Sequence, residues 1–239
     1  MKKIETLKTF LIENIHYLEP EGSSGTFPTH PEFDLYPRDF LKFAKTELNF
    51  LKEKKENLIH IINCLSHLKR AVDCQFDLFL YHLNLYELIK EKNLKFDKKL
   101  NFLKDIGIFE STSISRLNSI RNKMEHHYKI PDIVEIEVYF DLVNAFISII
   151  ESNLTLFLIN HEVQIGSTNE EKFNFFNLEY VFDKDPKIIF EVKHLDEMKD
   201  FSVSVDASEQ SEFAYYLRAL FTMLKLDYMK RDFILNELI

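Results

Sequence analysis

The segment from Arg121 to Tyr128 reads Arg-Asn-Lys-Met-Glu-His-His-Tyr and places a cation, an amide and an imidazole on neighbouring turns of a predicted helix. Because an α-helix advances about 100° per residue, Asn122 stacks with His126, and Arg121 stacks with Glu125. Apolar residues at three- and four-residue spacing predict the buried stripe of this helix: Ile114, Leu117, Ile120, Met124 and Tyr128. Asn122 and His126 are therefore expected to face away from the core.

These residue types fit chemistry on a phosphodiester. Histidine titrates near neutral pH and can therefore give or take a proton, and guanidinium donates two parallel hydrogen bonds to a phosphate. Cleavage beside a ribose 2′-hydroxyl needs a base for that proton and an acid for the leaving 5′-oxygen. One helix supplies Arg121 to hold the phosphate and His126 to move a proton, with Asn122 to position either group.

The pattern Arg-Asn-x-x-x-His-x-Tyr, late in a helix, resembles the HEPN superfamily, and the likeness extends diffusely over residues 37–160. The resemblance implies a short helical bundle that dimerises and brings two motifs together to cut RNA without a metal or cofactor. It implies catalytic roles for Arg121, Asn122 and His126. His127 is interpreted as structural, although the family also permits a spacing of six.

A second function stays open beside the ribonuclease. The bare Arg-to-His spacing arises easily by chance, and Asn and His are ordinary on a solvated helix face. Many HEPN-like domains have lost catalysis and only bind partners. The alternative is therefore a noncatalytic interaction module that binds a nucleotide or a partner protein, which the net charge of −9 and the large extension after residue 160 favour.

Tyr128 carries a further implication of the resemblance. In HEPN toxins that pair with a nucleotidyltransferase-type antitoxin, a Tyr two residues after the His receives adenylyl groups. The resemblance makes Tyr128 a candidate modification site and such an antitoxin a candidate partner. On an ideal helix Tyr128 points about 200° away from His126, so it reaches the groove only if the helix frays before Pro131. The spacing favours the other interpretation, in which Tyr128 ends the apolar stripe with its hydroxyl at the surface.

Length, composition and charge limit the kinds of protein that this chain can be. A chain of 239 residues with 46% hydrophobic content can bury a sizeable core. The acidic balance argues against a protein that coats nucleic acid nonspecifically, yet Arg116, Lys123 and Lys129 make the motif helix locally basic and are candidate RNA-binding residues. A second basic run is interpreted as a solvated amphipathic face: Lys90, Lys92, Lys95, Lys98 and Lys99.

Metal, redox and membrane signals are weak. Cys64 and Cys74 lie in an apolar helical stretch without zinc-type spacing, so we expect reduced core residues. His60 and His67 share a helix face but lack further ligands, and no metal site is predicted. The N-terminus lacks the apolar region of a signal peptide, and the run Leu142–Ile150 is too short to span a bilayer. We expect a cytoplasmic protein without a membrane segment.

The patterns divide the chain into three predicted parts. Residues 1–36 form a helix over 2–18, ended by Pro20, and a Pro- and Gly-rich loop from 19 to 37. Residues 37–160 form the helical bundle, with a break somewhere in 52–57 and an apolar central helix over about 132–159. Gly107 ends one helix, Ser111, Thr112 or Ser113 caps the motif helix, and Pro131 ends it.

Residues 161–239 are predicted as an extension of a different class. Alternating apolar residues near 173–182, 188–192 and 201–205 predict a three-stranded antiparallel meander. Asp206 and Glu209 frame a capping box before a last helix that carries Phe213 and Leu217 and covers the sheet. The predicted fold class is mainly α, a HEPN-like helical bundle with a small antiparallel β meander and a terminal helix appended as an α+β extension.

Overall fold

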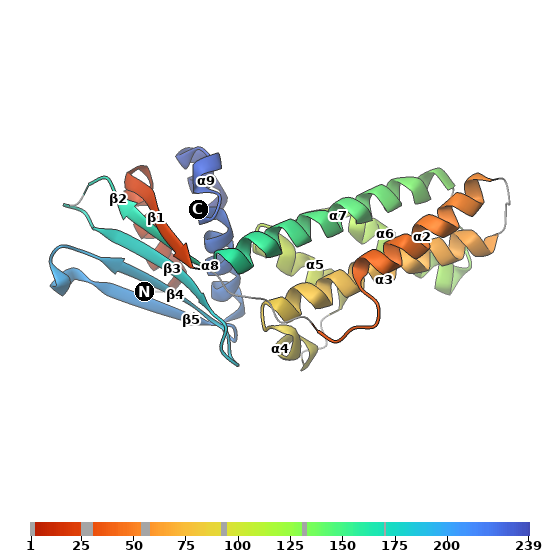
Figure 1. The fold of residues 1–239 in the computed structure, drawn as a ribbon, viewed down its shortest axis with the longest axis horizontal. Coiled ribbons are helices and arrows are strands. Elements are labelled where there is room, and N and C mark those ends of the chain that lie inside the picture. Colours follow the sequence, from red (N-terminus) through yellow and green to blue (C-terminus); the bar gives the residue numbers. More distant parts are fainter. Residues whose placement is uncertain (1–2, 25–30, 54–57, 92–94, 131–132, 170) are drawn as a thin grey trace.

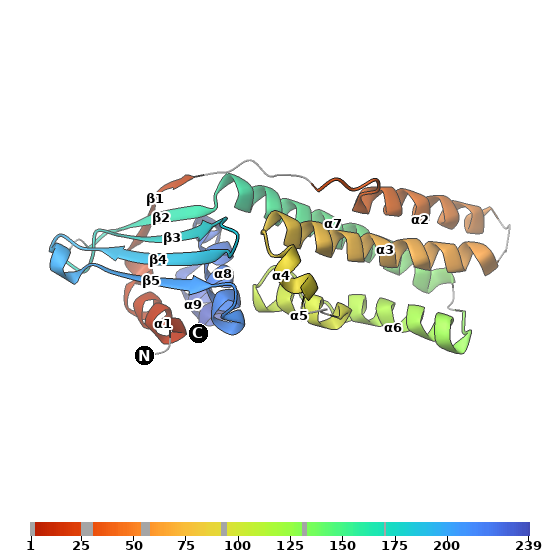
Figure 2. The ribbon, with the colours of Figure 1, turned by 90° about the horizontal axis from the view of Figure 1, so that it is seen from below.

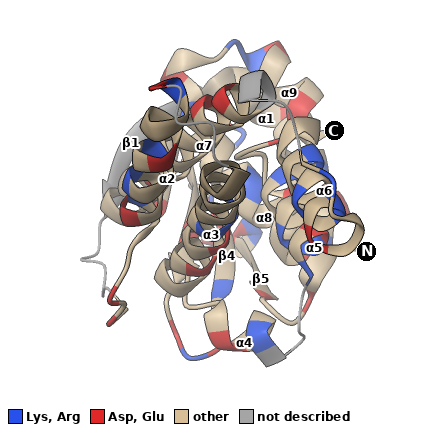
Figure 3. Cartoon of the chain, turned by 90° about the vertical axis from the view of Figure 1, so that its right-hand side faces the viewer, with Lys and Arg blue, Asp and Glu red and all other residues tan. Residues whose placement is uncertain are grey.

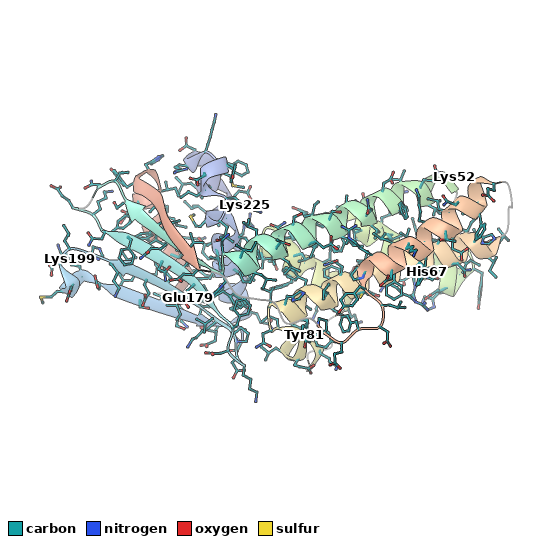
Figure 4. All side chains as sticks on the ribbon, viewed as in Figure 1. Lys52, His67, Tyr81, Glu179, Lys199 and Lys225 are labelled. Carbon is teal, nitrogen blue, oxygen red and sulfur yellow. The ribbon has the colours of Figure 1, made fainter. Side chains whose placement is uncertain are left out.

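The computed structural model describes residues 3–24, 31–53, 58–91, 95–130, 133–169 and 171–239. In these residues a helical bundle and a sheet lobe lie end to end along one long axis (Figure 1). Lys52 lies near the free end of the bundle and Lys199 at the opposite end of the sheet lobe (Figure 4). The predicted combination of a mainly helical fold with an antiparallel sheet is confirmed.

Apolar residues at helical spacing build the bundle. Its elements are α2 (Pro37–Lys52), α3 (Leu58–His82), α4 (Tyr86–Glu91), α5 (Phe96–Asp105), α6 (Thr112–His127) and α7 (Ile133–Ile159). Seen from the free end, α3 lies between α2 and α6 (Figure 3), and α7 packs on all three. The predicted break between α2 and α3 is confirmed, while residues 54–57 within it lie outside the described residues.

Gly107 ends α5 as predicted. Its φ of +70° lies in the left-handed region that glycine adopts without a steric penalty. The amide of Gly107 donates to the carbonyl of Lys104 at 2.9 Å, and the amide of Ile108 donates to Leu103 at 3.0 Å. A Cβ at Gly107 would lie 3.1 Å from Cγ of Arg218, so this turn packs directly against the sheet lobe.

The helix α7 is the apolar helix predicted over about 132–159, but α3 and not α7 lies between the other helices, and Val138 and Ile159 of α7 are exposed. Phe146, Ile147 and Ile150 are fully buried. Its stretch Ile136–Ile159 spans 24 residues and is long and apolar enough to cross a membrane by length and composition alone. The run Leu142–Ile150, which is too short to span a bilayer by itself, is the uncharged middle of this stretch, and the stretch as a whole also contains Glu137, Asp141 and Glu151. Its partial burial against α2, α3 and α6 is compatible with a soluble protein.

The sheet is larger than the predicted meander. Within the described residues, five antiparallel strands pair in chain order: β1 (Leu18–Ser24), β2 (Glu162–Ser167), β3 (Phe175–Val181), β4 (Lys187–Lys193) and β5 (Phe201–Asp206). The last three are the predicted strands. The strand β2 follows α7 directly, and its alternating residues Val163 and Ile165 are buried on the covered face.

The predicted loop after residue 18 is wrong over its first part. The helix α1 (Lys3–Asn14) ends earlier than expected, the short 3₁₀ helix η1 (Ile15–Tyr17) follows, and β1 pairs with β2. Proline is tolerated because β1 is an edge strand, and the register shifts between Pro20 and Gly22. Residues 3–24 thus join the sheet lobe and do not form a separate N-terminal part.

Helices from both ends of the chain cover one face of the sheet. The last predicted helix is α8 (Gln210–Met223), which packs on β2 to β5, and η3 (Leu226–Tyr228) and α9 (Arg231–Leu238) follow it. The predicted capping box forms only in part, because Asp206 donates its amide to Glu209 whereas α8 begins at Gln210. The ring of Phe10 from α1 meets Phe176 and Phe190 edge to face.

Candidate functional site

The helix α6 forms where the sequence places it. The Ser111 hydroxyl accepts a hydrogen bond from the amide of Ile114 at 3.3 Å, which confirms the predicted N-cap. Ile114, Leu117 and Met124 are buried against α3 and α7. His126 follows Leu117 by nine residues, or two and a half helical turns, and so lies on the opposite side of α6, which turns His126 outward because Leu117 is buried.

Tyr128 departs from the predicted apolar stripe. It follows the last helical residue with φ 55° and ψ 30°, and its amide donates to the carbonyl of Lys123. Its side chain is 88% exposed, so it does not pack at the end of the stripe. The left-handed backbone turns the chain away from the helix axis at this residue, and the proposed role of Pro131 in ending the helix lies outside the described residues.

Arg121 is held by its neighbours on the helix. One guanidinium nitrogen lies 2.6 Å from Oε1 of Glu125, and the other donates to Oδ1 of Asn122 at 3.4 Å. The Arg121 and Glu125 side chains are 32% and 37% exposed, so water screens this pair only in part. A phosphate that binds Arg121 must therefore compete with the Glu125 carboxylate.

His126 has no such partner among the residues that the structure describes, and both His126 and His127 are exposed. Asn122, one turn before His126, is half-buried beside Arg121. Arg121 and His126 leave the helix about 140° apart, because five residues separate them. A single helix therefore does not aim both groups at one atom.

The motif lies at the free end of the bundle, away from the sheet lobe (Figure 2). Arg116 and Lys123 are seven residues apart, so they share a face of α6, and both are exposed, as is Lys129 beyond the helix. The three predicted RNA-binding residues are therefore exposed, with Lys123 and Lys129 three residues on either side of His126 and Arg116 ten residues, or about 15 Å of helix rise, before it. Two pockets of the molecule, one between the lobes and one beside α1, are lined by other elements.

A second group of polar side chains around a histidine joins α2 and α3, and the sequence indicated only part of it. The ring nitrogen Nδ1 of His60 lies 2.5 Å from Oε2 of Glu47, and Asn63 donates to Oε1 of the same carboxylate at 3.2 Å. The His60 ring packs against Phe50 in a tilted arrangement with 5.1 Å between ring centroids, and His67 packs in a tilted arrangement against Phe43 at 5.4 Å. The shared face of His60 and His67 was visible in their spacing, whereas Glu47 was not, because it lies on another helix.

Cysteine and metal chemistry find no support among the described residues. Burial raises the pKa of Cys64 to about 12 and that of Cys74 to about 11, so both thiols stay protonated at neutral pH and are weak nucleophiles. Both cysteines are free, and Cys64 is buried as predicted while Cys74 is half-buried. No group of three or more His, Cys, Asp or Glu side chains in the described ranges could hold a metal ion.

No family model, no curated protein and no solved structure matches this chain.

Proposed function

We propose that this chain is a HEPN-like, metal-independent endoribonuclease that acts as a homodimer in the cytoplasm. The observation that carries the proposal is the outward projection of His126 from α6, beside the Arg121–Asn122 pair and among exposed cations. Phosphodiester cleavage by proton transfer requires imidazoles that can reach the substrate and a cation for the phosphate, and each α6 supplies one of each. The motif-bearing bundle, residues 37–160, is the HEPN-like part of the chain.

In the proposed reaction one His126 takes the proton of the ribose 2′-hydroxyl. The 2′-oxygen then attacks phosphorus, and the bond from phosphorus to the 5′-oxygen breaks. The second His126 of the dimer protonates the leaving 5′-oxygen, so the products carry a 2′,3′-cyclic phosphate and a 5′-hydroxyl. Arg121 offsets the charge that develops on the phosphoryl oxygens, and Asn122 holds its guanidinium.

The dimer follows from the geometry of one protomer. One α6 supplies one imidazole, and its Arg121 leaves the helix in a different direction. Two α6 helices related by a twofold axis would place the His126 of one protomer near the Arg121 of the other, which makes a composite groove. The free end of the bundle leaves α6 open to such a partner (Figure 2).

Glu125 sets the resting state of this site. Its carboxylate is paired with the Arg121 guanidinium, which in the proposed mechanism binds the phosphate. RNA must displace it, so Glu125 weakens binding of any single phosphate and favours substrates that also contact Arg116, Lys123 and Lys129. We propose that these three residues contribute the salt-dependent part of RNA binding.

The test is incubation of the purified protein with mixed RNA, with and without EDTA. The proposal predicts cleavage that EDTA leaves unchanged and fragments that end in 2′,3′-cyclic phosphate. Arg121→Ala should lose most of the cleavage while circular dichroism shows an unchanged fold, because the side chain is only half-buried. Intact RNA, or cleavage that needs a divalent metal, would contradict the proposal.

Regulation of the site is the second part of the proposal. The Tyr128 hydroxyl would attack the α-phosphorus of ATP on a nucleotidyltransferase-type antitoxin, with pyrophosphate leaving and the hydroxyl proton passing to solvent. The 88% exposure of Tyr128 supports access by such an enzyme. An added phosphate near Arg121 would compete with RNA. Co-expression with neighbouring genes should add adenylyl mass that Tyr128→Phe abolishes, and unchanged mass would leave Tyr128 unmodified.

A noncatalytic interaction module remains the alternative, and one observation favours it. The Arg121–Glu125 pair partly neutralises the cation that catalysis needs. In this function the same surface of α6 binds a nucleotide or a partner protein without cleaving anything. Retention of uncleaved RNA or nucleotide by the wild type, with loss of binding in Arg121→Ala, would support the module against the ribonuclease.

A further inference from the structure

The larger of the two described pockets lies between the helical bundle and the sheet lobe, and no residue of α6 lines it. It has a volume of about 820 Å³. The helices α1, α8 and α9 of the sheet lobe form one side, and α4 and α5 of the bundle form the other (Figure 2). Ligand sites commonly have this size and often lie where two structural units meet.

The floor of this interlobe pocket is apolar. Leu85 of the turn before α4, Phe213 and Ala214 of α8, and Leu238 of α9 are buried at its base. The half-buried side chains of Leu88, Ile89 and Phe102 form a wall from the bundle. An occupant with an alkyl or aryl body would remove this apolar surface from water.

The charged groups of the pocket lie at its rim, and some of them have ion-pair partners while others do not. Arg218 is bound to Glu237 at 2.7 Å, so this cation is neutralised within the rim. Lys8 approaches the ring of Tyr215 at 5.8 Å, and neither Lys8 nor Lys98 has a carboxylate within ion-pair distance among the described residues. Asp105 is the remaining rim carboxylate. Counted over side chains alone, and with the Arg218–Glu237 pair set aside, the two lysines exceed Asp105 by one positive charge, while Ile239 also lines the pocket.

The pocket is held open by contacts that tie the lobes together elsewhere. The Tyr180 hydroxyl of β3 donates to the carbonyl of Leu83 at 2.5 Å, and Asn84 donates to the carbonyl of Asp183 at 2.6 Å. Gly107 packs against Arg218 next to the rim. These contacts span the joint beside the pocket, so the hollow is a formed feature and its walls need not move far to accept an occupant.

We propose that the interlobe pocket binds an amphiphilic organic anion, a molecule with an apolar chain and a carboxylate or phosphate head. The chain lies on Leu85, Phe213 and Leu238, and the head lies at the rim between Lys8 and Lys98. This site is independent of the proposed ribonuclease, because α6 contributes no residue to its lining. Carboxylate and phosphate heads present the same charge to the two lysines, so the probes below distinguish them.

The test is isothermal titration calorimetry of the full chain with dodecanoate, dodecyl phosphate and dodecyltrimethylammonium. We expect saturable binding of one anion per chain and weaker or absent binding of the cation. The stronger of the two anions identifies the head group. Lys98→Glu should weaken binding roughly five-fold, because it replaces an exposed attraction with a repulsion. Lys98 is exposed on α5, so this change should leave folding intact.

Two further variants make the result decisive. Lys95→Glu changes an exposed lysine at the N-cap of α5 that does not line the pocket, and it should bind the anion as the wild type does. Leu88→Trp should fill the wall and abolish binding, with circular dichroism to verify the fold. Absence of binding, equal binding of the cationic probe, or equal losses in Lys95→Glu and Lys98→Glu would overturn the proposal.

Discussion

His126 on α6 and His60 on α3 are imidazoles on neighbouring helices of one bundle, yet their surroundings differ. His60 is held by the Glu47 carboxylate at 2.5 Å and packed against Phe50, whereas His126 projects into solvent at the end of its helix. A carboxylate that fixes an imidazole between two helices contributes to packing. An imidazole without a partner can approach a substrate. We therefore expect His60 to stabilise the fold and His126 to transfer protons.

The largest effect is expected at His126. His126→Ala should lower RNA cleavage by about 10²- to 10⁴-fold, because a group that transfers a proton in the transition state contributes that much. The melting temperature should stay unchanged, since the side chain is exposed. The matched control is His127→Ala, the next residue, which is also exposed and should retain most activity. Equal losses in both variants, measured with a labelled RNA, would contradict the assignment.

The opposite outcome is expected at His60. His60→Ala should lower the free energy of unfolding by about 1 kcal/mol, because it leaves the partly buried Glu47 carboxylate without its ring partner. Cleavage per folded molecule should not change. Urea denaturation of His60→Ala, Glu47→Gln and the double variant would measure the coupling between the two side chains. A coupling near zero, or a loss of cleavage in His60→Ala, would reverse the roles given to the two histidines.

A substitution at Glu125 tests whether Arg121 contacts RNA at the exposed site. Glu125→Gln frees the Arg121 guanidinium and should strengthen RNA binding roughly five-fold at low salt, with a smaller gain at high salt. Glu110→Gln is the matched control, because Glu110 pairs with Lys104 outside the motif and should leave RNA binding unchanged. Fluorescence anisotropy with a short RNA in the His126→Ala background avoids cleavage during the measurement. Unchanged binding in Glu125→Gln would show that Arg121 does not contact RNA.

The smallest effect concerns His67, the second histidine on the same face of α3, and the pH dependence of the free energy of unfolding. Burial and the charge of Arg70 lower the pKa of His67, while Glu47 opposes them. A histidine whose folded pKa is lowered binds its proton more readily in the unfolded chain. The free energy of unfolding should therefore fall as the pH drops through about 6.5. His67→Gln should reduce this slope in urea denaturation at pH 7.5 and 5.5, and an unchanged slope would assign the pH dependence to other groups.

The sequence predicted α6 well because local rules decide its form. Ser111 provides a hydroxyl at the helix start, and Leu117 and Met124 follow the helical period, so the cap and the outward face of His126 could be derived. The i,i+4 spacing also brings Arg121 and Glu125 together, and the contact in the structure agrees with that geometry. The motif residues are therefore placed by the helix itself.

Non-local pairing decides what the sequence did not predict. The strand β1 exists because β2 lies beside it, and its Pro20 and Gly22 indicated a loop when the segment was considered alone. The Glu47–His60 pair joins residues on two helices, and the interlobe pocket combines side chains from both ends of the chain. Tyr128 fitted the helical period but adopts a left-handed backbone at the helix end, which periodicity does not reveal.

The most direct test of the composite site is a mixing experiment. His126→Ala protein is co-expressed with an equal amount of wild-type chain, so that mixed dimers form, and cleavage is measured per wild-type chain. If both imidazoles of a dimer are needed, mixed dimers are inactive and cleavage falls to roughly half of that of the wild type alone. We expect this loss, together with a dimeric mass by light scattering. Unchanged cleavage per wild-type chain, or a monomeric mass, would show that each protomer works alone and would contradict the composite site.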